Sequence, residues 1–232
     1  MPRDAVIYIA NKYHYAEIMD QLLMFGFHIE NILNIGKVIA DMANRQYFDL
    51  AELPHTDEES FVDAGALNGD TSKAFLRWAG MQATHVYCFE PDAVNVEKCR
   101  RNLVSIADKV QVSIIEKATW SEPTCLHFSV HANGTSAISD RGGNVAATSL
   151  DEELGDARVT FIKLDVEGAE METLRGAEHI IRTQHLKLAV SVYHKTGDIL
   201  NVPELLLSYA PDYHFYLRHY CLFYNETVLY AV

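Results

Sequence analysis

Residues 60–71 read Ser60-Phe61-Val62-Asp63-Ala64-Gly65-Ala66-Leu67-Asn68-Gly69-Asp70-Thr71. The apolar residues at the start of this stretch are typical of a short buried strand. Gly65 and Gly69 allow the backbone to turn tightly and to come close to a ligand. Asp70 or Thr71 can then cap a helix. The stretch therefore predicts a strand, a glycine turn and a helix in direct succession.

The same alternation of strands and helices continues to the C-terminus. Repeated strand–helix units predict an α/β fold with a parallel sheet and helices on both of its faces. A closing hairpin at 213–220 and 227–232 requires one strand that runs antiparallel to the others. Further strands are expected at 85–89, 110–115, 159–164 and 186–193, an extra β segment at 126–131, and helices at 71–79, from about 92, at 169–182 and at 202–209.

Residues 1–50 have an organisation of their own. An apolar run at 5–10 predicts a strand, a helix is expected at 15–24, and 28–35 look like a second strand. This short N-terminal βαβ extension has no sheet to join. We interpret it as part of an incomplete upstream domain, with an element that pairs two chains into a homodimer or a lid as alternatives. Residues 51–59 are acidic and predict a linker, so the main domain is expected at 60–232.

Composition and charge exclude several classes of protein. Nineteen Lys and Arg against 32 Asp and Glu give the 232-residue chain a net charge of -13, which argues against nucleic acid as a partner. The four cysteines form no C-x-x-C pair, as is typical of a reducing compartment. No apolar run approaches the roughly 20 residues of a membrane span, and the first residues lack the pattern of a signal peptide. We therefore expect a cytoplasmic protein with no membrane partner.

Four neighbouring strands are expected to end in a polar side chain, namely Asp63, Glu90, Asp165 and His194. In open α/β sheets ligands bind beyond the carboxyl ends of the strands, so these side chains are expected to meet. A carboxylate placed like Glu90, one strand after Asp63, can accept both hydroxyls of a ribose. The glycine turn is not the G-x-G-x-x-G of dinucleotide folds. The carboxylates on either side of it suit a cationic ligand better than a pyrophosphate.

The sequence resembles the FkbM-type methyltransferases in four motifs and in the closing hairpin. The motifs are Asp63-Ala64-Gly65, Gly69-Asp70-Thr71, Glu90-Pro91-Asp92 and Lys163-Leu164-Asp165-Val166-Glu167-Gly168-Ala169-Glu170. The resemblance covers about residues 60–232. It implies a Rossmann-like class I methyltransferase fold, with a mostly parallel seven-stranded sheet that ends in an antiparallel hairpin. It also implies S-adenosylmethionine as the cofactor, and a hydroxyl of a sugar, a larger glycan, a polyketide or another small metabolite as the acceptor.

The resemblance further implies roles for individual residues. Asp63 and the glycine turn would hold the methionine part of the cofactor, Glu90 the ribose, and the end of the third strand the adenine. Asp165 would face the amino acid part or the point of methyl transfer. The cofactor-binding residues implied in this way are Asp63, Gly65, Ala66, Gly69, Asp70, Thr71, Glu90, Pro91, Ala118, Thr119, Trp120 and Asp165.

Methyl transfer to an alcohol is helped by a base. His194 is the better candidate by its intrinsic pKa, and Asp165 is the alternative base or a residue that orients His194. No metal is expected, because His127 and His131 lie on a β segment without a carboxylate partner. The loop 136–139 is either a cover over the substrate or a solvated connection.

Two other functions stay open at this point. One is a catalytically silent cofactor-binding protein that uses residues 1–50 to bind a partner. The other is a nicotinamide-dependent oxidoreductase, which is disfavoured by the missing glycine pattern and by Asp70 in the turn. The preferred hypothesis is an O-methyltransferase.

Overall fold

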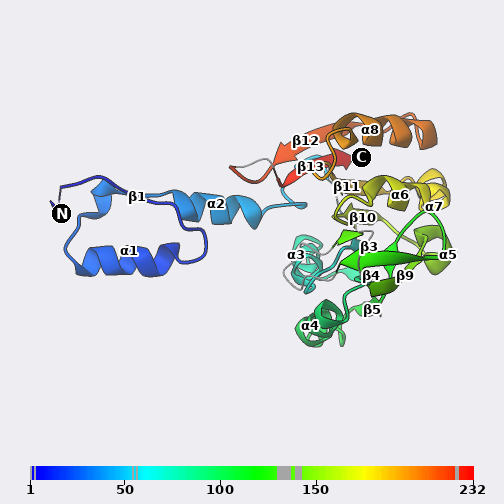
Figure 1. The fold of residues 1–232 in the computed structure, drawn as a ribbon, viewed down its shortest axis with the longest axis horizontal. Coiled ribbons are helices and arrows are strands. Elements are labelled where there is room, and N and C mark those ends of the chain that lie inside the picture. Colours follow the sequence, from blue (N-terminus) through cyan, green and yellow to red (C-terminus); the bar gives the residue numbers. More distant parts are fainter. Residues whose placement is uncertain are drawn as a thin grey trace. The chain divides into compact units, whose positions relative to one another are not determined.

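The computed structural model describes residues 2, 4–53, 55, 57–129, 137–138, 143–222 and 225–232 (Figure 1). These residues form two compact units. The first comprises the described residues up to Gln46 together with those of 219–226, and the second those of 47–218 and 227–232. The second unit thus begins at Tyr47, within the segment that the sequence assigns to the N-terminal extension.

The first unit contains the expected strand, helix and strand. β1 (Ile7–Ile9) and β2 (Ile32–Asn34) pair in parallel, and α1 (Tyr15–Met24) connects them together with a 3-10 turn at Ile29–Asn31. A further helix, α2 (Ile35–Ala43), was not expected. Asn34 caps α2, because its side chain accepts a hydrogen bond from the Lys37 backbone N–H at 2.9 Å. None of the residues of α1 is buried, so this unit lacks a core on that side.

The second unit is built on a seven-stranded sheet. Its order is β12-β13-β11-β10-β3-β4-β5. The neighbours from β11 to β5 pair in parallel, whereas β13 runs antiparallel to β11. The expected mostly parallel sheet with a closing antiparallel hairpin is therefore confirmed. The strands are β3 (Glu59–Ala64), β4 (Ala83–Phe89), β5 (Gln111–Ile115), β10 (Phe161–Leu164), β11 (Lys187–Ser191), β12 (Phe215–His219) and β13 (Thr227–Ala231).

Helices lie on both faces of this sheet, with α3 and α4 on one side and α6, α7 and α8 on the other (Figure 1). The single helix expected at 169–182 is wrong, since α6 and α7 are separate and Gly176 lies between them. A Cβ atom on Gly176 would lie 2.1 Å from the Trp120 carbonyl oxygen, so the backbone needs glycine here. The helices are α3 (Asp70–Trp78), α4 (Ala93–Leu103), α5 (Leu150–Leu154), α6 (Glu170–Arg175), α7 (Glu178–Gln184) and α8 (Asp198–Tyr209).

Alternation along the central strands gives the two faces of the sheet different cores. Val62 and Ile162 point into an aliphatic cluster with Leu174, whereas their neighbours Phe61 and Phe161 point to the other face. There Phe61 stacks on Phe75 with ring centroids 4.3 Å apart. Phe48 joins this aromatic group, 5.9 Å from Phe61 and 5.8 Å from Phe161. This packing is why the second unit begins before the predicted linker.

A small second sheet follows β5 in the chain. Its order is β6-β9-β7-β8, with β9 antiparallel to β7 and parallel to β6. The extra β segment was expected, but β9 was not. His131 and two residues of the loop 136–139 lie outside the described residues. The strands are β6 (Ala118–Thr119), β7 (Thr124–Ser129), β8 (Ala137–Ile138) and β9 (Gly143–Thr148). Among the described helices, none is both long and apolar enough to cross a membrane.

Candidate functional site

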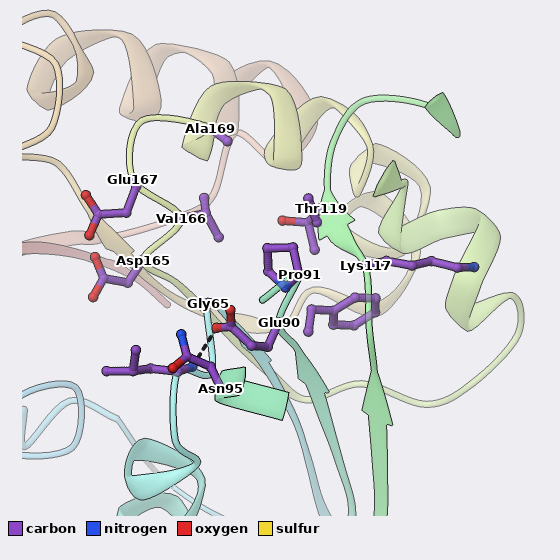
Figure 2. A pocket seen from close by; sticks show the side chains of 13 residues that line it. Gly65, Glu90, Pro91, Asn95, Lys117, Thr119, Asp165, Val166, Glu167 and Ala169 are labelled. Carbon is purple, nitrogen blue, oxygen red and sulfur yellow. Dashed lines mark hydrogen bonds between the residues drawn. The ribbon is translucent and has the colours of Figure 1, made fainter. Parts of the chain in front are cut away.

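A pocket opens beyond the carboxyl ends of β3, β4 and β10, where the sequence places its polar strand ends. Figure 2 shows Asp165 and Glu167 on one side of it, Lys117 and Thr119 on the other, and Glu90 between them. Apolar side chains fill the spaces between these polar groups, as is usual in small-molecule sites. The lining residues are Gly65, Leu67, Phe89, Glu90, Pro91, Asn95, Lys117, Ala118, Thr119, Asp165, Val166, Glu167 and Ala169.

Gly65 brings two strand ends into contact at the base of the pocket. Its backbone has φ +78°, in the left-handed region that favours glycine. A Cβ atom on Gly65 would lie 1.9 Å from the backbone oxygen of Asp165. Any side chain at this position would therefore push β3 away from the segment after β10. With glycine, the backbone itself forms this part of the pocket wall.

Glu90 is fixed by two backbone amides. Its Oε2 accepts a hydrogen bond from the Leu67 N–H at 2.9 Å, and its Oε1 accepts one from the Asp92 N–H at 3.0 Å. Burial raises the pKa of Glu90, and the hydrogen bonds from these two amides and from the Asn95 side chain oppose the rise only in part. A carboxylate can accept about four hydrogen bonds, so Glu90 keeps acceptor capacity. The arrangement suits a pair of ligand hydroxyls.

Asp63 lies beneath the glycine turn and does not line the pocket. It is fully buried, its Oδ2 accepts a hydrogen bond from the Ser72 hydroxyl at 2.7 Å, and its Oδ1 lies 3.1 Å from Lys163 Nζ. Lys163 also donates to the carbonyl oxygen of Gly65 at 2.8 Å. Burial by itself lowers the pKa of Lys163, but the charges of Asp63, Asp165 and Glu90 outweigh burial and raise it. The buried pair therefore supports the backbone of the turn.

Asp165 is held by two tyrosines that the sequence did not single out for the site. The hydroxyl of Tyr47 donates to Oδ2 at 3.0 Å, and the hydroxyl of Tyr193 donates to Oδ1 at 3.1 Å. Both oxygens of Asp165 are therefore engaged by the protein.

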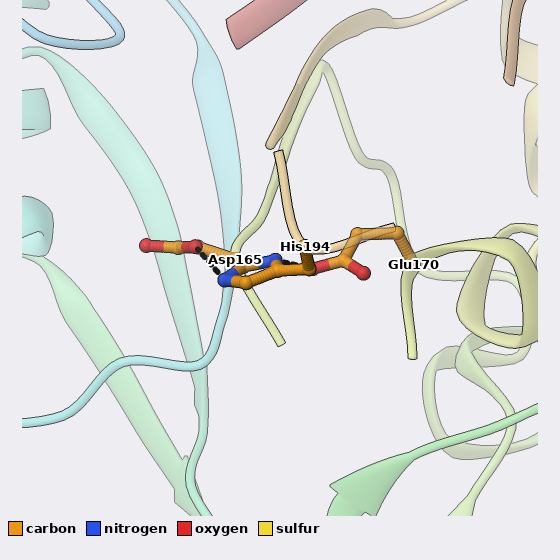
Figure 3. Close-up of side chains that lie close together, drawn as sticks. All are labelled: Asp165, Glu170 and His194. Atoms are coloured by element: carbon orange, nitrogen blue, oxygen red, sulfur yellow. Dashed lines mark hydrogen bonds and ion pairs between the residues drawn. The ribbon is translucent and has the colours of Figure 1, made fainter. Parts of the chain in front are cut away.

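His194 adjoins the pocket through Asp165. Its Nδ1 lies 2.8 Å from Oε1 of the fully buried Glu170 (Figure 3). Its Nε2 lies 3.5 Å from a Glu167 oxygen and 3.7 Å from Asp165 Oδ1. Within the described residues this buried Nε2 has no hydrogen-bond partner. Burial by itself lowers the pKa of His194, but the hydrogen bond with Glu170 and the nearby carboxylates outweigh burial and raise it.

Asp165, Glu170 and His194 form a cluster whose spacing would also allow them to bind a metal ion. One ligand atom of each lies within 4.8 Å of the others. Two tyrosine hydroxyls bind Asp165, and the Val166 N–H and His194 Nδ1 both contact Oε1 of Glu170. The protein thus satisfies both oxygens of Asp165, whereas Oε2 of Glu170 and Nε2 of His194 have no hydrogen-bond partner within the described residues.

The structure brings half of the expected cofactor residues into the pocket. Gly65, Glu90, Pro91, Ala118, Thr119 and Asp165 line it, whereas Asp63, Ala66, Gly69, Asp70, Thr71 and Trp120 do not. Asp70 points to solvent and pairs with Lys73 at 3.6 Å. Gly69 precedes α3 and packs against Leu103.

Several site residues were not expected. Leu67, Phe89, Asn95 and Lys117 line the pocket between predicted positions, and Glu170 binds His194. Proximity to the predicted strand ends could have indicated Phe89 and Lys117. No signal in the sequence indicates Tyr47, because its link to Asp165 spans 118 positions of the chain.

Comparison with known proteins gives a family and a related structure. Residues 63–217 match the sequence profile of the methyltransferase FkbM domain. A methyltransferase FkbM from Methylobacillus flagellatus is similar in structure, with 27% identity and a TM-score of 0.71 over 82% of this chain and 47% of that one. The chain thus spans about half the length of that relative. A search of curated proteins gave no match.

More distant structures are methyltransferases as well. A precorrin-6y C5,15-methyltransferase from Geobacter metallireducens has 13% identity and a TM-score of 0.49, over 86% of this chain and 89% of that one. An rRNA methylase from Streptococcus thermophilus has 15% identity and a TM-score of 0.48, over 85% and 93%. Similarity at this level carries no argument about the substrate.

Proposed function

This chain belongs to the methyltransferase FkbM domain family, and from this premise we propose that it methylates a hydroxyl group of a sugar, polyketide or other small metabolite. S-adenosylmethionine is the cofactor. The observation that carries the choice of a hydroxyl acceptor is His194, whose Nε2 is buried without a hydrogen-bond partner among the described residues, next to a pocket residue.

The chemistry of the pocket fits this cofactor. Glu90 keeps acceptor capacity after binding two backbone amides and the Asn95 side chain, which suits the hydroxyls of a ribose. Asp165 and Glu167 lie on one side, where a positively charged amino acid and sulfonium part would be stabilised. Pro91, Ala118 and other small or apolar side chains suit a planar base.

We assign the binding roles accordingly. Glu90 holds the ribose, Ala118 and Thr119 flank the adenine, and Asp165 faces the charged part of the cofactor. Asp63 contributes indirectly, because with Lys163 it fixes the turn at Gly65. When it is bound, the cofactor supplies an electrophilic methyl group.

The protein mainly has to position the attacking hydroxyl and to remove its proton. His194 is the proposed base, since its Nε2 has no hydrogen-bond partner within the described residues, while Glu170 fixes the ring through Nδ1. General base catalysis of this kind contributes about 10²- to 10⁴-fold. Asp165 is the weaker choice as base because each of its oxygens already accepts a hydrogen bond from a tyrosine hydroxyl.

Calorimetric titration with S-adenosylmethionine tests the proposal first, with NAD as the control ligand. Binding of the first and not of the second is expected, and it would justify a screen of sugar and metabolite hydroxyls as acceptors. Binding of NAD alone would replace the proposal with an oxidoreductase. With an acceptor in hand, His194→Gln should leave cofactor affinity nearly intact while it slows turnover.

A further inference from the structure

Asp165 is held at both of its carboxylate oxygens. Tyr47 donates to Oδ2 at 3.0 Å and Tyr193 donates to Oδ1 at 3.1 Å. The two hydroxyls come from distant parts of the chain, because Tyr47 precedes the family match at 63–217 and Tyr193 follows β11. Hydrogen bonds from two sides fix the orientation of the carboxylate.

Tyr47 is itself firmly placed. It is 5% exposed, its hydroxyl lies 3.5 Å from Ser191 Oγ, and its ring lies 5.6 Å from Lys163 Nζ. Its backbone has φ 73°, which is rare for a bulky residue and persists only where the surrounding contacts determine it. Tyr47 is thus an integral part of the second unit.

The position of Asp165 has a direct consequence for His194. Oδ1 of Asp165 lies 3.7 Å from His194 Nε2, beyond hydrogen-bond distance. A carboxylate that was free to turn would move toward a partly buried imidazolium, because opposite charges attract strongly there. Such a pair would occupy the nitrogen that the proposed function needs.

We propose that Tyr47 and Tyr193 are positioning residues that keep Asp165 beyond hydrogen-bond distance of His194. Nε2 of His194 then remains available to accept the proton of the acceptor hydroxyl. The proposal rests on the proposed function, in which His194 is the base. Neither tyrosine lines the pocket. Tyr47 acts through Asp165, whereas Tyr193 also contacts His194 directly, with ring centroids 4.1 Å apart, a contact that Tyr193→Phe preserves.

Several other charged groups face His194. Glu170 on α6 binds Nδ1, and Glu167 lies near Nε2. Asp198 on α8 adds a negative charge near His194, and Lys195, the next residue in the chain, adds a positive one. The Tyr47 hydroxyl binds Asp165, so a Tyr47 variant that lacks it loses this hydrogen bond, and a changed titration of His194 is the expected sign that Asp165 has moved.

Tyr47→Phe removes the hydroxyl and keeps the ring. NMR titration of the imidazoles in the full chain measures the pKa of His194 without any acceptor, and the signal is identified by its loss in His194→Gln. We expect the pKa of His194 to rise by roughly 0.5 to 1 pH unit, because the released Asp165 pairs with the imidazolium. Tyr193→Phe frees Oδ1 and should raise it as well.

Tyr213→Phe is the matched control. Tyr213 is also 5% exposed, and its hydroxyl donates to the Leu186 carbonyl at 2.7 Å. This hydrogen bond involves neither Asp165 nor His194. This variant should lower the thermal midpoint and leave the His194 titration unchanged. The same result for Tyr47→Phe would overturn the proposal and leave Tyr47 a packing role.

Two further outcomes are informative. If Tyr47→Phe does not fold, Tyr193→Phe decides the question by the same titration. If the wild-type chain does not bind S-adenosylmethionine, the proposed function fails, whereas the NMR result on Asp165 and His194 is independent of any ligand. The two failures are thereby distinguishable.

Discussion

The ends of β3 and β10 are neighbours in the sheet, and each carries an aspartate in different surroundings. Asp63 lies inside β3 and pairs in register with Lys163 of β10, whereas Asp165 follows the last residue of β10 and is level with Gly65. Asp63 is fully buried against Lys163 and Ser72. Asp165 lines the pocket and is bound by tyrosines.

The difference shows what a shift along a strand does to a carboxylate. A side chain inside a central strand points into a packed layer, where a charge needs a partner of opposite sign. A side chain just beyond the strand end escapes that layer and reaches the ligand side of the sheet. One aspartate therefore supports the turn, and the other faces the ligand.

Removal of the cation under the turn should have the largest effect. Lys163→Met leaves Asp63 as an uncompensated buried charge, so the free energy of unfolding should fall by about 3–5 kcal/mol. Urea unfolding measures it. Lys73→Met is the control, since its pair with the exposed Asp70 should matter by less than about 1 kcal/mol. Equal effects of the two variants would contradict the structural role of the buried pair.

Asp165→Asn should separate ligand binding from stability. The loss of a charge that faces the cofactor should weaken S-adenosylmethionine binding by about 1.5–3 kcal/mol in calorimetric titration. Urea unfolding should change far less than in Lys163→Met, because an amide can still accept from one tyrosine. An unchanged dissociation constant would remove Asp165 from the cofactor site.

The pH dependence of stability should reveal the charge on His194. The folded-state pKa of His194 is raised above its unfolded value of 6.5, so the imidazolium stabilises the fold below that pH. This contribution should decline as the pH rises through the folded-state pKa. Urea unfolding of wild type and His194→Gln between pH 5 and pH 9 measures the difference between their free energies of unfolding. This difference should become smaller toward high pH. A constant difference over this range would argue against a charged His194.

Asp70→Ala should have the smallest effect on the ligand. The side chain points to solvent beside Lys73, away from the lining of the pocket. Cofactor binding should therefore stay within about 0.5 kcal/mol of the wild-type value. A larger loss in calorimetry would restore the role that the motif at 69–71 suggests for this residue.

The sequence predicted the main sheet well because its pattern is local. Apolar runs of strand length alternate with helical periodicity, and each pair of elements is joined by a short turn. The break between α6 and α7 was missed, since Gly176 lies there against the carbonyl of Trp120, a contact with a residue more than fifty positions earlier in the chain. The strand β9 was missed because it pairs with β7 across the intervening segment.

The candidate site was predicted in part for the same reason. Glu90 and Asp165 line the pocket as expected, because their positions at strand ends follow from the order of the elements. Asp63 was expected beside the ligand, but it is buried under the turn, where it pairs with Lys163. The sequence pattern shows Lys163 only as one residue of a buried strand, so it does not indicate this pair. Local spacing does not tell which of two polar neighbours turns inward.

The sequence by itself determined the α/β class, the strand ends that carry acidic side chains and the family resemblance. These depend on periodicity and on short motifs, which are local properties of the chain. Only the tertiary structure decided that Tyr47 and Tyr193 bind one carboxylate, that Lys163 neutralises Asp63 and that Glu170 orients His194. Contacts between residues far apart in the chain exist only after the sheet has assembled, because side-chain hydrogen bonds need distances of about 3 Å that no spacing rule fixes.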